Sequence, residues 1–369
     1  MAVSPIRDML RCVRLPSGNH FAARARRVAL ALLLHHGALP VSNELNILRD
    51  RCGRRIEYLR LSVTDRCDLR CAYCLPRGFR DFVQPSGWLT FGEIERLVSS
   101  FADLGVSRVR LTGGEPLLRR DLPELATRLS LIPGIADLSL STNGTLLVRH
   151  AAALHRAGVS RLNVSLDTLN RQRMCAISGR DALPEVLRGL MAAREQGFAP
   201  IKINMVPLAG INEDEVDAMA EFCMQNGFVL RLVELMPVGL AARGLRPAAL
   251  EPIRARLRQR YGLVEGVIPG GGPARYLVTA DGRFSVGFIT PISQHFCANC
   301  NRVRITVDGV LHLCLGEEAR VDLRVLLRGG ATDEELAATI IRAIRDKPER
   351  HDFGNSSRRI VRVMAATGG

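Results

Sequence analysis

Six of the ten cysteines in this chain of 369 residues fall into two triads with the spacing of metal ligands. Thiolates clustered in this way suit zinc or an iron–sulfur cluster. A closed zinc site needs four ligands and each triad supplies three, whereas three thiolates on a cubane cluster leave one iron open to another molecule. The first triad, at CxxxCxxC spacing, is Cys67, Cys71 and Cys74. The second has CxxC spacing and a third cysteine after thirteen intervening residues, and it is Cys297, Cys300 and Cys314.

Zinc stays open as an alternative, above all at the second triad. His295 or His312 would complete a Cys₃His zinc site there. The scattered cysteines Cys12, Cys52 and Cys175, together with Cys223, are interpreted as free thiols, since a chain of this length does not resemble a small disulfide scaffold.

A regular alternation of strands and helices begins near Arg54 and positions the first triad. Helix starts are predicted after the capping-box residue Thr90, after Asp121, at Pro184 and after Asn212. Six strand–helix units with short loops predict a parallel sheet with right-handed crossovers, closed as a partial (β/α)₆ TIM-type barrel with its site at the carboxyl ends of the strands. The expected strands are residues 58–63, 108–112, 138–142, 162–165, 201–206 and 229–234.

The carboxyl ends of these strands carry polar and glycine-rich segments. Each segment alone is a common turn former, but together they surround one edge of the sheet. The first strand leads into the first triad, and the others carry or lead into Thr112-Gly113-Gly114-Glu115-Pro116, Ser141-Thr142-Asn143-Gly144, Ser165-Leu166-Asp167, Lys202, Arg231 and Met236.

The chain divides into three parts by composition. Residues 1–50 are basic and resemble an organelle transit peptide, a weak signal peptide or an extension without fixed structure, and we favour the last. Residues 51–239 form the barrel-like core. Residues 240–369 form an α+β extension that carries the second triad, with strands expected at 283–290 and 302–307.

A net charge of +14 indicates anionic partners. Aromatic residues make up 5% of the chain and no nucleic-acid motif occurs, so nucleic acid is not the expected partner. No apolar run approaches the ~20 residues that span a bilayer. We therefore expect a cytoplasmic protein with no membrane partner, with targeting by residues 1–50 left open.

The CxxxCxYC segment, with an aromatic before the third cysteine, resembles the signature of radical S-adenosylmethionine (SAM) enzymes, and residues 112–116 resemble their glycine motif. Both triads together resemble the GTP 3′,8-cyclase (MoaA) family of molybdenum cofactor biosynthesis. The likeness runs from about Asp50 to the final Gly368-Gly369. It includes the stretches 59–67, 110–117, 163–169 and 302–304.

The resemblance implies two [4Fe-4S] clusters and SAM as cofactors. The first triad would hold the cluster that cleaves SAM, and the open iron of the second would bind the guanine of GTP. Arg302 and Arg304 would also take part in catalysis. The implied SAM contacts are Tyr73, Gly114, Ser165 and Met236, and the implied GTP contacts are Arg60, Arg110, Ser141, Lys202, Arg302, Val303 and Arg304.

The implied reaction is conversion of GTP to (8S)-3′,8-cyclo-7,8-dihydroguanosine 5′-triphosphate. A 5′-deoxyadenosyl radical takes hydrogen from C3′, and the resulting radical attacks C8. The implied partners are GTP, an electron donor and the next enzyme, cyclic pyranopterin monophosphate synthase, with a monomer or homodimer expected. Two alternatives remain open: a radical SAM enzyme that modifies peptides, and a basic zinc protein that binds nucleic acid.

Overall fold

The computed structural model describes residues 47–368 except 77, 240, 243, 269, 271, 352 and 354–361. These residues belong to one compact unit that begins at Asn46. Residues 1–46 and Gly369, and with them most of the N-terminal extension, lie outside the described residues. Leu48 and Asp50, which the sequence analysis placed in that extension, are buried, so the folded unit begins before residue 51. No described helix is long and apolar enough to cross a membrane.

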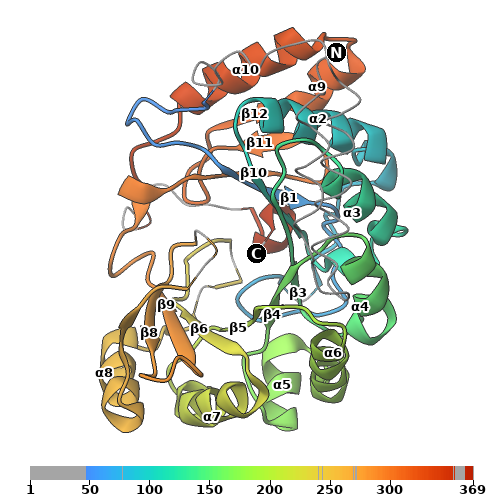
Figure 1. Cartoon of the computed structure of the whole chain (residues 1–369). Helices are drawn as coiled ribbons and strands as arrows, with labels where there is room; N and C mark the ends of the chain where they lie inside the picture. The colour runs from blue at the N-terminus through green and yellow to red at the C-terminus, as the bar shows by residue number, and fades with distance from the viewer. Residues whose placement is uncertain are drawn as a thin grey trace, which may run out of the picture. The chain divides into compact units, whose positions relative to one another are not determined.

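Six parallel strands form the centre of the fold, and the predicted bounds of these six are confirmed to within one residue at either end (Figure 1). The two strands expected in the extension, 283–290 and 302–307, are also present but shorter, as 285–289 and 302–305. They lie in the order β1-β2-β3-β4-β5-β6, as right-handed strand–helix units require. Their bounds are β1 Tyr58–Ser62, β2 Arg108–Thr112, β3 Asp137–Thr142, β4 Arg161–Ser165, β5 Ile201–Met205 and β6 Val229–Val233.

Helices pack outside the strands (Figure 1). Apolar strand residues such as Leu59, Leu61 and Val109 are fully buried, while alternate positions carry polar side chains to the other face. These apolar side chains form the core between the strands and the helices. The helices of this half are α2 Phe91–Asp103, α3 Leu122–Ser130, α4 Leu147–Arg156, α5 Arg171–Ser178, α6 Leu183–Glu195 and α7 Val216–Asn226.

The helices start where they were predicted to start, but not every predicted N-cap residue forms a side-chain cap. Thr90 forms the complete capping box with Glu93. Asp121 precedes α3 in a left-handed conformation and makes no side-chain cap. Asn212 precedes a 3₁₀ turn and caps nothing, because its side chain bonds the backbone of Leu208 and Asp167 instead. Helix α5 was not predicted.

The C-terminal extension adds strands to both edges of the six-stranded core, which gives one sheet of twelve strands. β10 pairs in parallel with β1, and β9 in parallel with β6. β7 and β8 were not predicted. The added elements are α8 Leu250–Tyr261, β7 Val264–Gly266, β8 Arg275–Val278, β9 Ser285–Ile289, β10 Arg302–Ile305, β11 Val310–His312, β12 Arg320–Asp322, α9 Leu323–Arg328, α10 Asp333–Arg345 and α11 Met364–Thr367.

Gly189 allows α6 to pack closely against the start of α4. A Cβ atom at Gly189 would lie 2.5 Å from the carbonyl oxygen of Gly144. We expect Gly189→Ala to destabilise the protein by about 1–3 kcal/mol, because backbone must move to admit the methyl group. Thermal unfolding measures this. The control is Gly92→Ala in α2, where a Cβ meets nothing within 4 Å and helix propensity predicts no loss; equal melting temperatures for the two variants would contradict the close packing.

Candidate functional site

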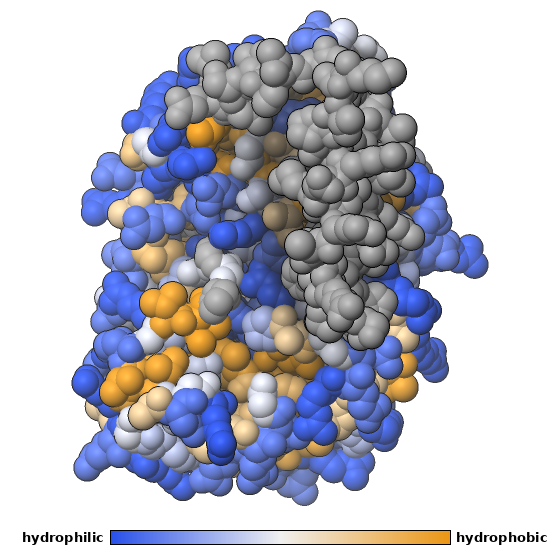
Figure 2. All heavy atoms as spheres, viewed as in Figure 1, coloured by the Kyte–Doolittle hydropathy of each residue, from blue (hydrophilic) through white to orange (hydrophobic). Residues whose placement is uncertain are grey.

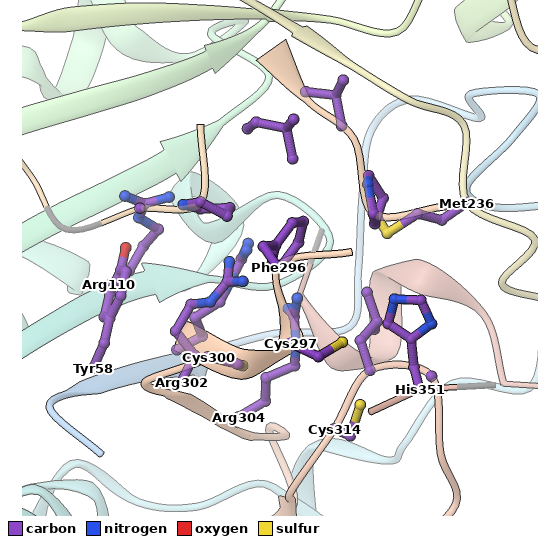
Figure 3. A pocket seen from close by; sticks show the side chains of 18 of the residues that line it. Tyr58, Arg110, Met236, Phe296, Cys297, Cys300, Arg302, Arg304, Cys314 and His351 are labelled. Atoms are coloured by element: carbon purple, nitrogen blue, oxygen red, sulfur yellow. The ribbon is translucent and has the colours of Figure 1, made fainter. Parts of the chain in front are cut away.

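A cavity lies where the inner face of the core strands meets the C-terminal extension (Figure 3). Its described lining residues include no Asp or Glu. Polar side chains also lie in the central hollow of the face in Figure 2. A cavity lined by positively charged side chains and by no described acid suits a polyanion. Its cationic residues are Arg60, Arg110, Lys202, Arg231, Arg302, Arg304 and Lys347.

Strand register places three of these arginines side by side. Arg60 of β1 lies opposite Arg110 of β2 and Arg304 of β10. Burial, then the charges of Arg304 and Arg110, lowers the pKa of Arg60 well below its usual range. Burial raises the pKa of the neighbouring Tyr58, but Arg110, Arg60 and Arg302 together outweigh it, so the net shift is downward. The electrostatic potential around these arginines is therefore strongly positive.

Lys202 and Arg231 form a second cationic group on β5 and β6. Burial, then Arg231 and Arg161, lowers the pKa of Lys202 to about 7. Arg231 is held by the side-chain oxygens of Asn163 and Asn204, the latter at 2.8 Å. Tyr276 of β8 lies beside both, with its hydroxyl 3.4 Å from Lys202 Nζ. These contacts fix two cations on one wall of the cavity.

All three cysteines of the second triad line the same cavity (Figure 3). Cys297 begins a 3₁₀ turn, Cys300 precedes β10 and Cys314 follows β11. At Cys300 burial opposes ionisation, but the charges of Lys347 and Arg302 outweigh it and lower the pKa to about 7. Cys300 therefore ionises more readily than an ordinary thiol.

Two histidines flank Cys297. Ring nitrogens of His295 and His351 lie 3.4 Å apart, and both are within 4.8 Å of Cys297 Sγ. His312 lines the cavity, where burial and then Arg362 lower its pKa to about 4. His295 therefore lies close enough to Cys297 to serve as the fourth ligand of a Cys₃His zinc site.

The first triad lies in the loop that follows β1. Burial raises the pKa of Cys67 and of Cys74 to about 12, and that of Cys71 well above its ordinary value. The Asn143 side-chain amide lies 3.8 Å from Cys67 Sγ. Tyr73 donates a 2.6 Å hydrogen bond to Asp167, whose pKa burial raises to about 6.

Both triads suit a cationic metal group. Buried thiols gathered without a nearby cation stay protonated, as the raised pKa values of the first triad indicate, and a metal group that binds thiolates reverses this preference. All six cysteines are free, so no disulfide competes. Three thiolates at each place fit an iron–sulfur cluster with one open iron.

The glycine-rich turn after β2 packs against the segment that enters the first triad. A Cβ at Gly114 would lie 2.2 Å from the carbonyl oxygen of Arg66, and Gly114 N–H donates to Thr64. The Glu115 carboxylate is fully buried, and burial raises its pKa to about 7 although Asn143 and Thr142 donate to it. Glu115 therefore joins the ends of β2 and β3.

The C-terminal tail lies between the two triads. The Ala365 N–H donates to Cys74 Sγ in the first triad. Arg304, beside the second triad, donates to the Gly368 carbonyl at 2.5 Å. A Cβ at Gly368 would lie 2.4 Å from Thr112 Cγ2, so only glycine fits there. The tail docks as far as residue 368.

The structure groups the predicted residues into two places. Every residue assigned to GTP lines the cavity, together with Met236 and the second triad. Tyr73, Gly114 and Ser165 do not line it; Tyr73 and Gly114 lie at the first triad's loop. The prediction missed Tyr58, Tyr276, Asn163 and Asn204 and left Arg231 without a role. The alternation of side chains along a strand could have indicated Tyr58, because it puts Tyr58 on the same strand face as Arg60.

Comparison with known proteins gives two family matches. Residues 61–223 match the radical SAM superfamily, and residues 228–353 match Molybdenum Cofactor Synthesis C. The chain is 45% identical over 327 residues to a GTP 3′,8-cyclase of Marinobacter nauticus, which covers 87% of this chain and 98% of that protein. It is 45% identical over 331 residues to that of Paracoccus denitrificans, covering 87% and 96%.

A solved structure supports the fold alone. Streptococcus suis SuiB bound to S-adenosylmethionine aligns with a TM-score of 0.58 at 17% identity, covering 90% of this chain and 75% of SuiB. The sequence identities to the bacterial cyclases, over nearly their whole length, decide the family. The chain belongs to the GTP 3′,8-cyclase family of radical SAM proteins.

Proposed function

We propose that this chain converts GTP to (8S)-3′,8-cyclo-7,8-dihydroguanosine 5′-triphosphate, the first step of molybdenum cofactor biosynthesis. The observation that carries the proposal is the cavity with seven cationic side chains, no described acid and the second triad in its wall. Family membership supplies the reaction: a 5′-deoxyadenosyl radical takes hydrogen from C3′, and the C3′ radical attacks C8. The cofactors are two [4Fe-4S] clusters and SAM.

Cys67, Cys71 and Cys74 hold the first cluster in this proposal, and when bound it supplies the electron that cleaves SAM. Tyr73, Gly114, Ser165 and Met236 contact SAM. The bond from Tyr73 to Asp167 and the contact of Gly114 with Arg66 fix the loop that carries the cysteines. These side chains hold the reacting groups in place, which is the protein's part in such chemistry.

GTP lies across the cavity with its base at the second triad. Sheet order supports this orientation. Arg302, Val303 and Arg304 belong to β10 next to β1, whereas Lys202 and Arg231 lie on β5 and β6, across the sheet. A ligand that reaches both must be long. The triphosphate pairs with Lys202 and Arg231, and Arg60, Arg110 and Ser141 contact the middle.

The division into a SAM-handling core, residues 51–239, and a substrate-anchoring extension, residues 240–369, is part of this proposal. An electron donor and cyclic pyranopterin monophosphate synthase are the proposed partners besides GTP. The uniform charge of the cavity, enclosed rather than spread on a surface, supports a small anion over nucleic acid.

Replacing one cysteine in each triad tests the proposal. Cys71→Ser is expected to abolish 5′-deoxyadenosine formation with SAM and dithionite, because two thiolates remain for a cluster that needs three. Cys300→Ser is expected to form some 5′-deoxyadenosine but no cyclised product. Iron counting after anaerobic reconstitution accompanies both assays. Normal GTP cyclisation by Cys300→Ser, or zinc at its triad, would rule out the anchoring role.

Gly114→Ala is expected to lose most SAM cleavage while keeping its fold. The added methyl group would push the Arg66 carbonyl, one residue before Cys67. The measurements are 5′-deoxyadenosine yield and SAM affinity, with Gly92→Ala as the control because its Cβ meets no atom. Equal SAM affinity and yield in the two variants would mean that the turn does not position SAM.

GTP affinity is expected to fall as pH rises from about 7.5 to 9. The free enzyme holds the pKa of Lys202 at about 7, so a bound triphosphate must raise this pKa and draw in a proton. Calorimetry in buffers of different ionisation enthalpy measures the proton uptake. In Lys202→Met this uptake should vanish; if its pH profile matches that of the unmodified enzyme, another group is responsible.

A further inference from the structure

Only two of the 51 basic Lys and Arg residues are lysines, Lys202 and Lys347, and both line the cavity. Lysine carries a compact ammonium with three rotatable donors, whereas arginine carries a planar fork. A chain that otherwise uses arginine for its positive charges therefore places a compact cation at two points of one cavity. The proposed function explains Lys202 but gives Lys347 no role.

Lys347 joins the two segments that carry Cys300 and Cys314. Its side chain is buried, and its Nζ donates to the carbonyl oxygens of Arg302 at 3.0 Å and Leu313 at 2.5 Å. Arg302 lies two residues after Cys300, and Leu313 directly precedes Cys314. One ammonium thus fixes the separation of two cysteines on different segments.

Arg54 makes the corresponding link to Cys297. Its buried guanidinium donates to the carbonyl oxygen of Cys297 at 2.8 Å, and also to those of Pro348 and Glu349 at 2.6 and 2.7 Å. The last two residues directly follow Lys347. Buried cations therefore tie segment 347–349 to the backbone beside each cysteine of the second triad.

The charge of Lys347 faces the triad rather than a carboxylate. Among the described residues its bonding partners are the two carbonyls, and no acid lines the cavity. A buried ammonium without a counter-charge is costly. Thiolates of Cys300 and Cys314, in the same cavity wall, are the anions that can compensate it.

We propose that Lys347 is a positioning residue of the second iron–sulfur centre, where it fixes the cysteine backbone and stabilises the cluster's reduced, more negative state. A nearby positive charge in a poorly screened interior favours the state with one more electron and so raises the reduction potential. The inference rests on the proposed function only in needing a cluster at this triad.

The test is a redox titration followed by electron paramagnetic resonance, without GTP or SAM. The first triad is replaced by alanines so that only the second cluster gives a signal. Lys347→Gln keeps N–H donors and removes the charge, Lys347→Met removes both, and Lys347→Arg keeps the charge. Arg345→Gln is the matched control, because it removes a positive charge two residues before Lys347 from an exposed side chain outside the cavity.

Both neutral variants are expected to lower the ratio of reduced to oxidised cluster at a fixed potential by about tenfold, equal to a shift of about 59 mV for one electron. Lys347→Arg should stay within about threefold of the parent, and Arg345→Gln should not change this ratio, because water screens an exposed charge. Loss of the second cluster alone from Lys347→Met, with an unchanged melting temperature, would also support the positioning role.

An unchanged potential in Lys347→Gln, or an equal shift in Lys347→Arg, would overturn the proposal. Unfolding of both neutral variants would show that Lys347 is needed for the fold as a whole, and this too would overturn the proposal. Iron counting separates this outcome from failure of the proposed function. A parent protein without a redox-active second centre contradicts both. A redox-active second centre whose potential does not move in Lys347→Gln, together with normal GTP cyclisation by the chain with both triads intact, contradicts only the inference about Lys347.

Discussion

The accumulation of like charge on one face of the sheet is the constraint on which the rest of the site depends. Parallel register brings Arg60 beside Arg110 and Arg304, and the described residues that line the cavity include no Asp or Glu. The repulsion among these arginines is tolerated because apolar residues on the opposite strand face, under the helices, hold the strands in register. The asparagines at Arg231 satisfy its donors without cancelling its charge, which leaves that charge for a ligand.

Strand positions were predictable because the core strands leave a clear local pattern, in which apolar and polar residues alternate between turn residues. Helix α5 was missed because its sequence, RQRMCAIS, is largely polar and carries little apolar periodicity. Strands β7 and β8 lie beside glycine and proline residues, which are typical of loops, so the sequence did not indicate strands there. Their pairing, like that of β10 with β1, is set by the edges of the sheet, which local sequence does not encode.

The site was predictable to different degrees for different residues. The cysteines were evident from spacing, and the resemblance supplied the GTP-assigned residues that share the cavity. Tyr276 could not be found in this way, because it reaches Lys202 from a strand that the sequence did not predict. Asp121 and Asn212 show the opposite case: the residue type marked the helix start correctly, although the cap itself does not form.

Apolar contacts and the C-terminal tail connect the surroundings of the two triads. Val238 and Met364 form a small buried cluster, against which Cys74 of the first triad and Met236 and Leu315 pack. Leu315 directly follows Cys314 of the second triad. An apolar seam between the two triads excludes water, and Met364 of the tail is part of it. Gly368 has to be glycine because the tail passes so close to Thr112 that a side chain would displace it.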